Sequence, residues 1–197
     1  MTALLIRHAD TAAIGRVLWG RKPGLSLSAA GAAQARRLAT RLGRAPIDAI
    51  YASPRERAQE TARPLALAHR LPVVTAAALD EVDFGDWSGR EFRELDERAD
   101  WRAFNGDRAS AQAPNGERLI DVQHRIVAEL TGLLSRHGGG TVAIVSHAEV
   151  IRCAVLHYLE MPLDAFTRIE IGPASITTIT LADGTPTLLS INEPDRC

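Results

Sequence analysis

The chain has 197 residues, of which 46% are hydrophobic and 24% charged, a composition typical of a globular protein that can bury a core without disulfides or metals. Its 23 basic and 24 acidic side chains give a formal net charge of −1, which excludes the overall basic field of a nucleic-acid-binding protein. No apolar run is long enough to span a membrane, and the run at 3–6 is too short for a signal peptide, so we expect a cytoplasmic protein without a membrane partner.

Six short apolar runs rich in β-branched residues predict strands, at 3–6, 47–51, 71–75, 141–145, 175–180 and 187–191. Amphipathic patterns between them predict helices, at 28–42, 54–69, 117–136 and 148–159. The run Ser53-Pro54-Arg55-Glu56 is typical of a capping box, which makes Ser53 the expected N-cap and Pro54 the expected first helical residue. Asp183-Gly184 predicts a hairpin turn between the last two strands.

This alternation predicts an α/β fold, a three-layer sandwich whose mostly parallel central sheet has helices on both faces and an antiparallel edge strand from the final hairpin. We expect one domain over residues 1–197, because the chain contains no repeat and no low-complexity segment. Its two cysteines, Cys153 and Cys197, form neither a disulfide framework nor a zinc pattern, so we expect reduced thiols.

Residues 84–115 interrupt the alternation and contain five of the nine aromatic residues, namely Phe84, Trp87, Phe92, Trp101 and Phe104. Two interpretations are open: a structural insert that packs on the body, or a small lid over an active site. Under the second interpretation these aromatic side chains give the mouth of the site apolar walls.

Two predicted strands are followed by histidine, as Arg7-His8 after the first and Ser146-His147 after the fourth. Because parallel strands end at the same edge of a sheet, we expect the two imidazoles to converge there. Arg7 and Arg57 would supply guanidinium groups to a phosphate dianion, and a protonated His147 a third positive group. A neutral His8 could attack phosphorus, and a carboxyl group such as that of Glu81 could protonate the departing oxygen.

These motifs, in this order, resemble the histidine phosphatase superfamily, also called the phosphoglycerate mutase-like family, over nearly the whole chain. The resemblance rests on Arg7-His8-Ala9-Asp10-Thr11, on Ser53-Pro54 with Arg57-Ala58, on Glu81 with Phe84-Gly85, and on Val145-Ser146-His147. It implies that His8 is the phosphorylated nucleophile, that Arg7, Arg57 and His147 bind the phosphate, and that Glu81 donates the proton. It implies no metal and no other cofactor. We expect substrate contacts from Thr11, Trp19, Gly20, Phe84 and Glu149.

Three residues depart from the family's pattern. Ala9 stands where the family usually has glycine, and an alanine fits there without strain only if its φ is negative. Ile14 replaces the asparagine of the mutases, and Glu149 would repel a second phosphate. The sequence therefore predicts a metal-independent phosphatase that acts on a small phosphorylated metabolite and transfers the phosphoryl group to water. A phosphoglycerate mutase and a non-catalytic phospho-ligand binder remain as alternatives, and both a monomer and a homo-oligomer stay open.

Overall fold

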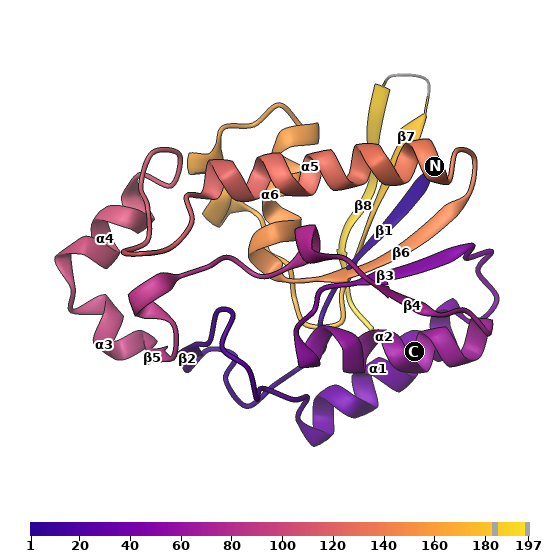
Figure 1. Ribbon diagram of the computed structural model, residues 1–197, viewed down its shortest axis with the longest axis horizontal. Coiled ribbons are helices and arrows are strands. Elements are labelled where there is room, and N and C mark those ends of the chain that lie inside the picture. Colours follow the sequence, from indigo (N-terminus) through magenta and orange to yellow (C-terminus); the bar gives the residue numbers. More distant parts are fainter. Residues whose placement is uncertain (183–184, 196–197) are drawn as a thin grey trace.

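The computed structural model of the chain describes residues 1–182 and 185–195 and contains a six-stranded sheet in the order β4-β3-β6-β1-β7-β8 (Figure 1). The strands are β1 (Thr2–Arg7), β3 (Ala49–Ala52), β4 (Val73–Thr75), β6 (Thr141–Ser146), β7 (Ile176–Ala182) and β8 (Thr185–Glu193). The first four strands of this order are parallel to one another. Strand β7 runs antiparallel to both β1 and β8, so the final hairpin forms the mixed edge of the sheet.

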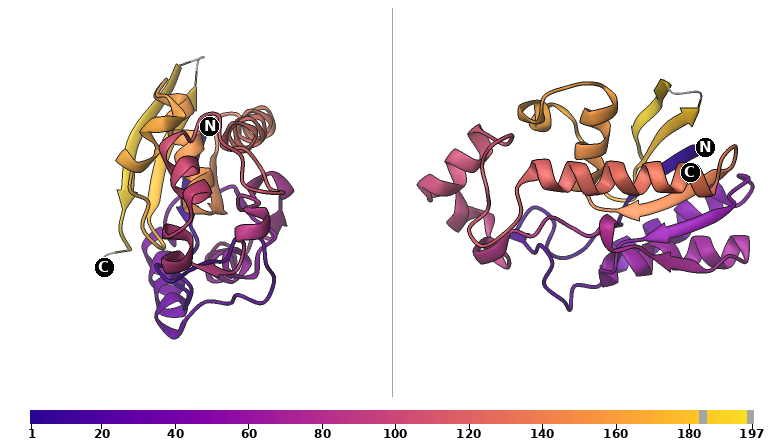
Figure 2. Two further views of the ribbon diagram at one scale, coloured as in Figure 1. Left: turned by 90° about the vertical axis from the view of Figure 1, so that its left-hand side faces the viewer. Right: turned by 45° about the horizontal axis from the view of Figure 1, so that its top comes forward.

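Two helices cover each face of this sheet (Figures 1 and 2). They are α1 (Ala29–Leu42) and α2 (Glu56–His69) on one face, and α5 (Leu119–Arg136) and α6 (Ala148–Tyr158) on the other. Strand β1 shows how the sequence builds these layers: Leu4 and Ile6 pack with the core of α1 and α2, whereas Leu5 packs with that of α5 and α6. The predicted three-layer α/β fold is confirmed.

One predicted boundary is wrong in an informative way. Helix α2 begins at Glu56 with Arg55 as its N-cap, so Ser53 does not cap it. The Ser53 backbone N–H still donates to the Val145 carbonyl oxygen at 2.9 Å and therefore belongs to the sheet ladder. The chain can begin a helix only after it has left that ladder. Ser28, in contrast, is the N-cap of α1 as predicted, and accepts from the Gly31 N–H at 2.9 Å.

Residues 84–115 form a set of short elements beside the carboxyl ends of the parallel strands. They include the 3-10 turn η2 (Gly85–Trp87), strand β5 (Arg90–Glu91), which pairs with β2 (Val17–Leu18), and helices α3 (Phe92–Asp96) and α4 (Ala99–Gly106). The Trp87 ring centroid lies 5.2 Å from those of both Trp101 and Phe104, and all three side chains belong to the core under α5. These three therefore do not form apolar walls of a mouth, contrary to the prediction; that the segment acts as a lid stays a prediction.

The remaining elements are the 3-10 helices η1 (Ala77–Leu79) and η3 (Leu163–Arg168). Cys153 is a buried free thiol on α6, whereas Cys197 and the predicted Asp183-Gly184 turn lie outside the described residues. Among the helices of the described part of the chain, none is both long and apolar enough to cross a membrane.

Candidate active site

Strands β1 and β6 deliver two histidines to the same edge of the sheet. Arg7 is paired in register with Ser146, and the His8 N–H extends the ladder by donating to the Ser146 carbonyl oxygen at 2.9 Å. The next residue after each strand is therefore a histidine, and the ring centroids of His8 and His147 lie 5.3 Å apart. Both rings are buried, so the predicted convergence of the two imidazoles is present in the structure.

A cavity of about 110 Å³ lies in front of His8. The predicted site residues that line it are Arg7, His8, Thr11, Trp19, Gly20, Arg57, Glu81, Phe84 and Glu149. His147 is fully buried beside the cavity, with its Nδ1 3.2 Å from Arg57 and 3.4 Å from Glu81. Within residues 1–182 and 185–195, no three His, Cys, Asp or Glu side chains converge as metal ligands would.

The contacts of His8 determine which of its ring nitrogens holds a lone pair. Nδ1 lies 2.8 Å from the Ala9 carbonyl oxygen, which can only accept, so Nδ1 carries the proton. Nε2 then accepts from the Arg57 Nε–H at 3.3 Å. Burial, followed by the charges of Arg57 and Arg7, lowers the pKa of His8 well below its usual 6.5. The ring is therefore neutral at pH 7, with a nucleophilic Nε2.

The residue after His8 fits the backbone that this arrangement requires. Ala9 is not among the described residues with a positive φ, so its methyl group causes no strain there. Its N–H donates to Thr61 Oγ1 at 2.9 Å, which ties the loop after β1 to helix α2.

Among the described residues that line the cavity with His8, three side chains that can donate a hydrogen bond have a buried polar atom without a partner. The atoms are Arg7 Nε, Arg57 Nη1 and Thr11 Oγ1, all buried within the described part of the protein. The other end of each guanidinium is fixed, because Arg7 Nη1 donates to the Ile171 carbonyl oxygen at 2.7 Å and Arg57 Nη2 to that of Gly20 at 3.0 Å. Buried donors without partners are costly unless a ligand satisfies them, so this set is suited to the oxygens of an anion.

His147 is held from behind by Ser53 and Asp80. The Ser53 hydroxyl donates to Asp80 Oδ1 at 3.4 Å and accepts from the His147 Nε2–H at 2.8 Å. Nδ1 then accepts from Arg57 Nη2. Burial, followed by the charge of Arg57, lowers the pKa of His147 well below 6.5, so the ring is neutral here and contributes a polar contact rather than a positive charge. Sequence reasoning missed these roles of Ser53 and Asp80.

Glu81 is a carboxyl group that retains its proton close to neutral pH. Burial raises its pKa to about 7 despite the opposing effect of Arg57. Its Oε1 accepts from the Val82 N–H at 2.9 Å, and its Oε2 lies 3.4 Å from His147 Nδ1. A carboxyl group with this pKa can act as a proton donor beside His8.

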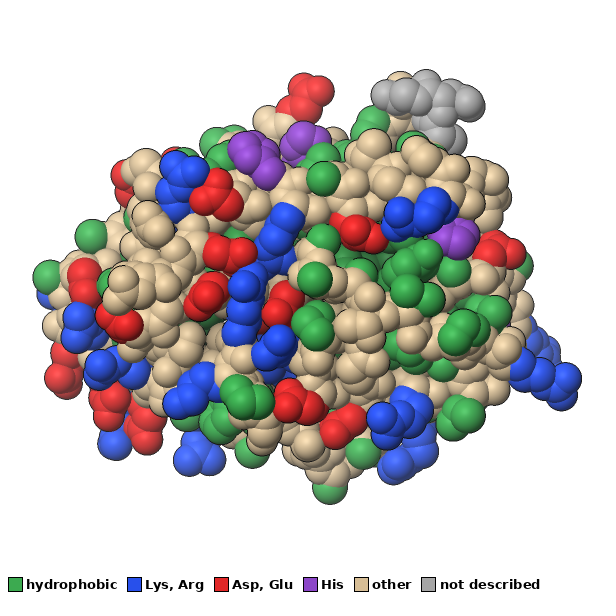
Figure 3. Space-filling view, in the orientation of Figure 1, with side chains coloured by type: hydrophobic (Ala, Val, Ile, Leu, Met, Phe, Trp, Pro, Cys, Tyr) green, Lys and Arg blue, Asp and Glu red, His purple; other side chains and the backbone are tan. Residues whose placement is uncertain are grey.

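Two arginines fix the backbone at Glu81. Arg21 Nε and Arg125 Nη2 donate to the Glu81 carbonyl oxygen at 2.7 Å and 3.1 Å. Arg21 also forms an ion pair with Glu117 at 2.8 Å. Figure 3 shows basic and acidic side chains side by side across the middle of this face of the molecule. Nothing in the sequence pattern signals that these distant arginines position the carboxyl group.

Gly20 has a conformation and an environment that require glycine. Its φ is +60°, and a Cβ atom there would lie 2.7 Å from Ser88 Oγ. The neighbouring Trp19 donates its indole N–H to the Lys22 carbonyl oxygen at 2.8 Å, which leaves its ring as a wall of the cavity. The predicted contacts at Trp19 and Gly20 therefore lie at the cavity, one through a ring and one through its backbone.

The similarity to known proteins extends over the whole fold. The family model described as histidine phosphatase superfamily (branch 1) matches residues 3–194. Phosphoserine phosphatase 1 of Hydrogenobacter thermophilus is 32% identical over an alignment that covers 96% of this chain and 90% of that protein. The adenosylcobalamin/alpha-ribazole phosphatase of Escherichia coli is 29% identical over 98% of this chain and 96% of its own. The solved structure of Bacillus stearothermophilus YhfR has a TM-score of 0.90 and 29% identity, covering 98% of this chain and 96% of that one.

Proposed function

The chain belongs to branch 1 of the histidine phosphatase superfamily, and we propose that it hydrolyses small phosphate monoesters by two successive transfers through His8. Hydrolysis of phosphate monoesters is the activity that its family and its phosphatase relatives support. One observation carries the assignment of the residues. His8, whose Nε2 contacts Arg57, lines the same cavity as Arg7, Arg57 and Thr11, each of which has a buried polar atom without a protein partner in the described chain.

In the first step, His8 Nε2 attacks phosphorus in line with the ester oxygen. The nitrogen–phosphorus bond forms as the phosphorus–oxygen bond breaks, and Glu81 gives its proton to the departing alcohol. In the second step, water attacks the phosphohistidine and gives a proton back to Glu81. Inorganic phosphate leaves and the neutral imidazole is restored. The guanidinium groups of Arg7 and Arg57 stabilise the charge on the transferred oxygens in both steps.

The distribution of charge in the cavity supports water as the phosphoryl acceptor, over the mutase alternative. A mutase must also hold the second charged group of a bisphosphate. Among the described residues that line the cavity, the basic ones are Arg7, His8 and Arg57, and these belong to the site of the first phosphate. The neutral His8 and the raised pKa of Glu81 support catalysis over the alternative of a non-catalytic binder.

We propose further that the reaction needs no metal ion, because His8 and Glu81 supply the nucleophile and the proton. The remaining proposals follow the sequence predictions: one domain over 1–197, a lid over 84–115, a cytoplasmic location, and a small phosphate monoester as the partner rather than nucleic acid or membrane. The near-neutral net charge of the chain supports a partner other than nucleic acid.

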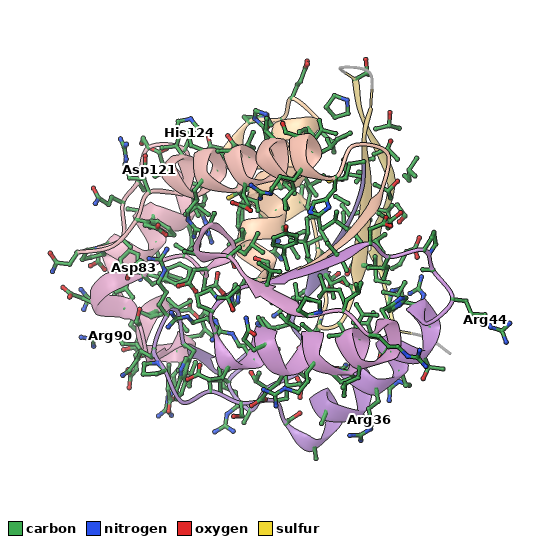
Figure 4. All side chains as sticks on the ribbon, turned by 45° about the vertical axis from the view of Figure 1, so that its right-hand side comes forward. Arg36, Arg44, Asp83, Arg90, Asp121 and His124 are labelled. Atoms are coloured by element: carbon green, nitrogen blue, oxygen red, sulfur yellow. The ribbon has the colours of Figure 1, made fainter. Side chains whose placement is uncertain are left out.

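Trapping of the phosphohistidine by quenching in alkali tests the proposal. We expect a radiolabelled alkyl phosphate, quenched in alkali during turnover in EDTA, to leave label on the protein that is stable to base and lost in acid. His8→Ala should abolish both the label and turnover. His124→Ala is the matched control, because His124 is exposed on α5 (Figure 4), and it should retain both. Turnover by His8→Ala, or label on another residue, would contradict the assignment.

A further inference from the structure

Apart from the residues assigned to the reaction, the cavity is lined mostly by apolar side chains and by one further carboxylate. The walls come from the stretch 13–25, which includes Ile14 and Leu18, and from Phe84 and Phe92. Glu149, at the start of α6, is the polar side chain among them. A leaving group that extends from the phosphate therefore meets apolar surface and this carboxylate.

The two oxygens of Glu149 are in different situations. Oε1 accepts from Arg152 Nη1 at 3.4 Å. Oε2 is buried and has no hydrogen-bond partner in the described chain; Arg108 Nη1 lies 3.7 Å away, beyond hydrogen-bond distance. Arg108 is itself fixed between two rings, with its guanidinium carbon 5.0 Å from the Phe104 centroid and 4.7 Å from that of Phe166. Oε2 thus forms an ion pair with Arg108 but accepts no hydrogen bond from the described chain.

The charge of Glu149 acts on the other ionisable groups of the site, since it opposes the lowering of the pKa of Arg7. It contributes to the raised pKa of Glu81, so the two carboxylates are electrostatically coupled. The cations of the described cavity lining, Arg7 and Arg57, are those that the proposed function assigns to the transferred phosphate. A carboxylate or second phosphate on the leaving group would therefore meet the carboxylate of Glu149, while Arg108 and Arg152, 3.7 Å and 3.4 Å from Glu149, are already paired with it.

We propose that Glu149 selects the leaving group. Its Oε2 accepts a hydrogen bond from a hydroxyl or ammonium group on a mostly apolar alcohol, and its charge disfavours alcohols that carry a further anion. This inference rests on the proposed function and names the class of ester that the same site hydrolyses.

A series of primary alkyl phosphates that differ only in the terminal group tests the selection. The terminal groups are methyl, hydroxyl, ammonium and carboxylate, each on alkyl chains of two lengths. For each phosphate, kcat/KM is divided by that of the methyl-terminated phosphate of the same length. We expect kcat/KM to be about tenfold higher for the hydroxyl- and ammonium-terminated phosphates than for the methyl-terminated one, and about tenfold lower for the carboxylate-terminated one. In Glu149→Gln, the ammonium advantage and the carboxylate penalty should both shrink to within about threefold, because the charge is gone. Glu160→Gln removes the same charge from an exposed position and should keep the wild-type ratios.

Two results would overturn the inference. One is a carboxylate-terminated phosphate hydrolysed as fast as the hydroxyl- and ammonium-terminated ones at both chain lengths, and the other is a set of kcat/KM ratios that Glu149→Gln leaves unchanged. Each ratio is internal to one protein, so a general loss of activity in a variant does not imitate selectivity. If Glu149→Gln fails to fold, the wild-type series alone decides. Hydrolysis of all esters with equal rates refutes only the role of Glu149, whereas no hydrolysis of any ester, 4-nitrophenyl phosphate included, refutes the proposed function as well.

Discussion

Replacement of Glu81 by glutamine tests the proton donor, because glutamine keeps the shape of the side chain and cannot release a proton. An alkoxide needs that proton in order to leave, so we expect kcat/KM for an alkyl phosphate to fall by about 10²- to 10⁴-fold. The 4-nitrophenolate ion leaves without a proton, so kcat/KM for 4-nitrophenyl phosphate should fall less than about tenfold. Glu160→Gln serves as the control and should hydrolyse both esters as the wild type does.

The raised pKa of Glu81 also predicts how the ratio of kcat/KM values for the two esters changes with pH. With burial raising the pKa of Glu81 to about 7, the protonated fraction falls from about nine tenths at about pH 6 to about one tenth at about pH 8. Wild-type kcat/KM for the alkyl ester should therefore fall about tenfold over this interval relative to 4-nitrophenyl phosphate, and the ratio should be constant in Glu81→Gln. Steady-state rates for both esters across the interval check it. A Glu81→Gln enzyme that hydrolyses the alkyl ester within tenfold of the wild type, or that keeps the fall in the ratio, would refute the assignment.

Substitutions at three further positions test the rest of the site. Arg57→Lys replaces a guanidinium that contacts both imidazoles with a single ammonium, so the inhibition constant of inorganic phosphate should rise about tenfold or more; an unchanged constant would remove Arg57 from the phosphate site. Gly20→Ala should lower the free energy of unfolding by about 1–3 kcal/mol in urea titrations, because of its φ of +60° and the approach of Cβ to Ser88 Oγ at 2.7 Å; equal midpoints would contradict this. Ser53→Ala removes the acceptor of His147 Nε2 and should lower kcat/KM about tenfold, whereas Ser53→Thr should restore most of it; equal losses would indicate a packing effect instead.

The sequence allowed the sheet, its flanking helices and the meeting of His8 with His147 to be predicted, because strand periodicity and strand ends are local signals. It could not reveal how Glu81 is held. Arg21 and Arg125 reach its carbonyl oxygen from 60 and 44 residues away along the chain, and no local pattern encodes such contacts. Ser53 was misassigned for a related reason. A serine between a strand and a helix satisfies the capping pattern, and only the pairing of the neighbouring strand shows that its backbone is already engaged.

The aromatic residues of 84–115 show a similar limit. Composition indicated that Trp87 and Phe84 belong together, but their fates differ: Trp87 packs against Trp101 and Phe104, while Phe84 lines the cavity. A cluster of aromatic residues in a sequence does not distinguish a small core from a substrate wall, since both require the same apolar surface.

The pairing of β1 with β6 has a consequence for how this enzyme can change. The spacing of hydrogen-bonded neighbouring strands sets the separation of the two imidazoles. Trp19, Phe84 and Glu149, in contrast, lie in connecting segments and at a helix terminus. Mutations in those segments can change which esters are preferred without moving the two imidazoles. Insertion or deletion of one residue within β6 has the opposite effect: it shifts the strand by one position, turns its side chains to the other face and dismantles the chemistry while leaving the substrate walls in place.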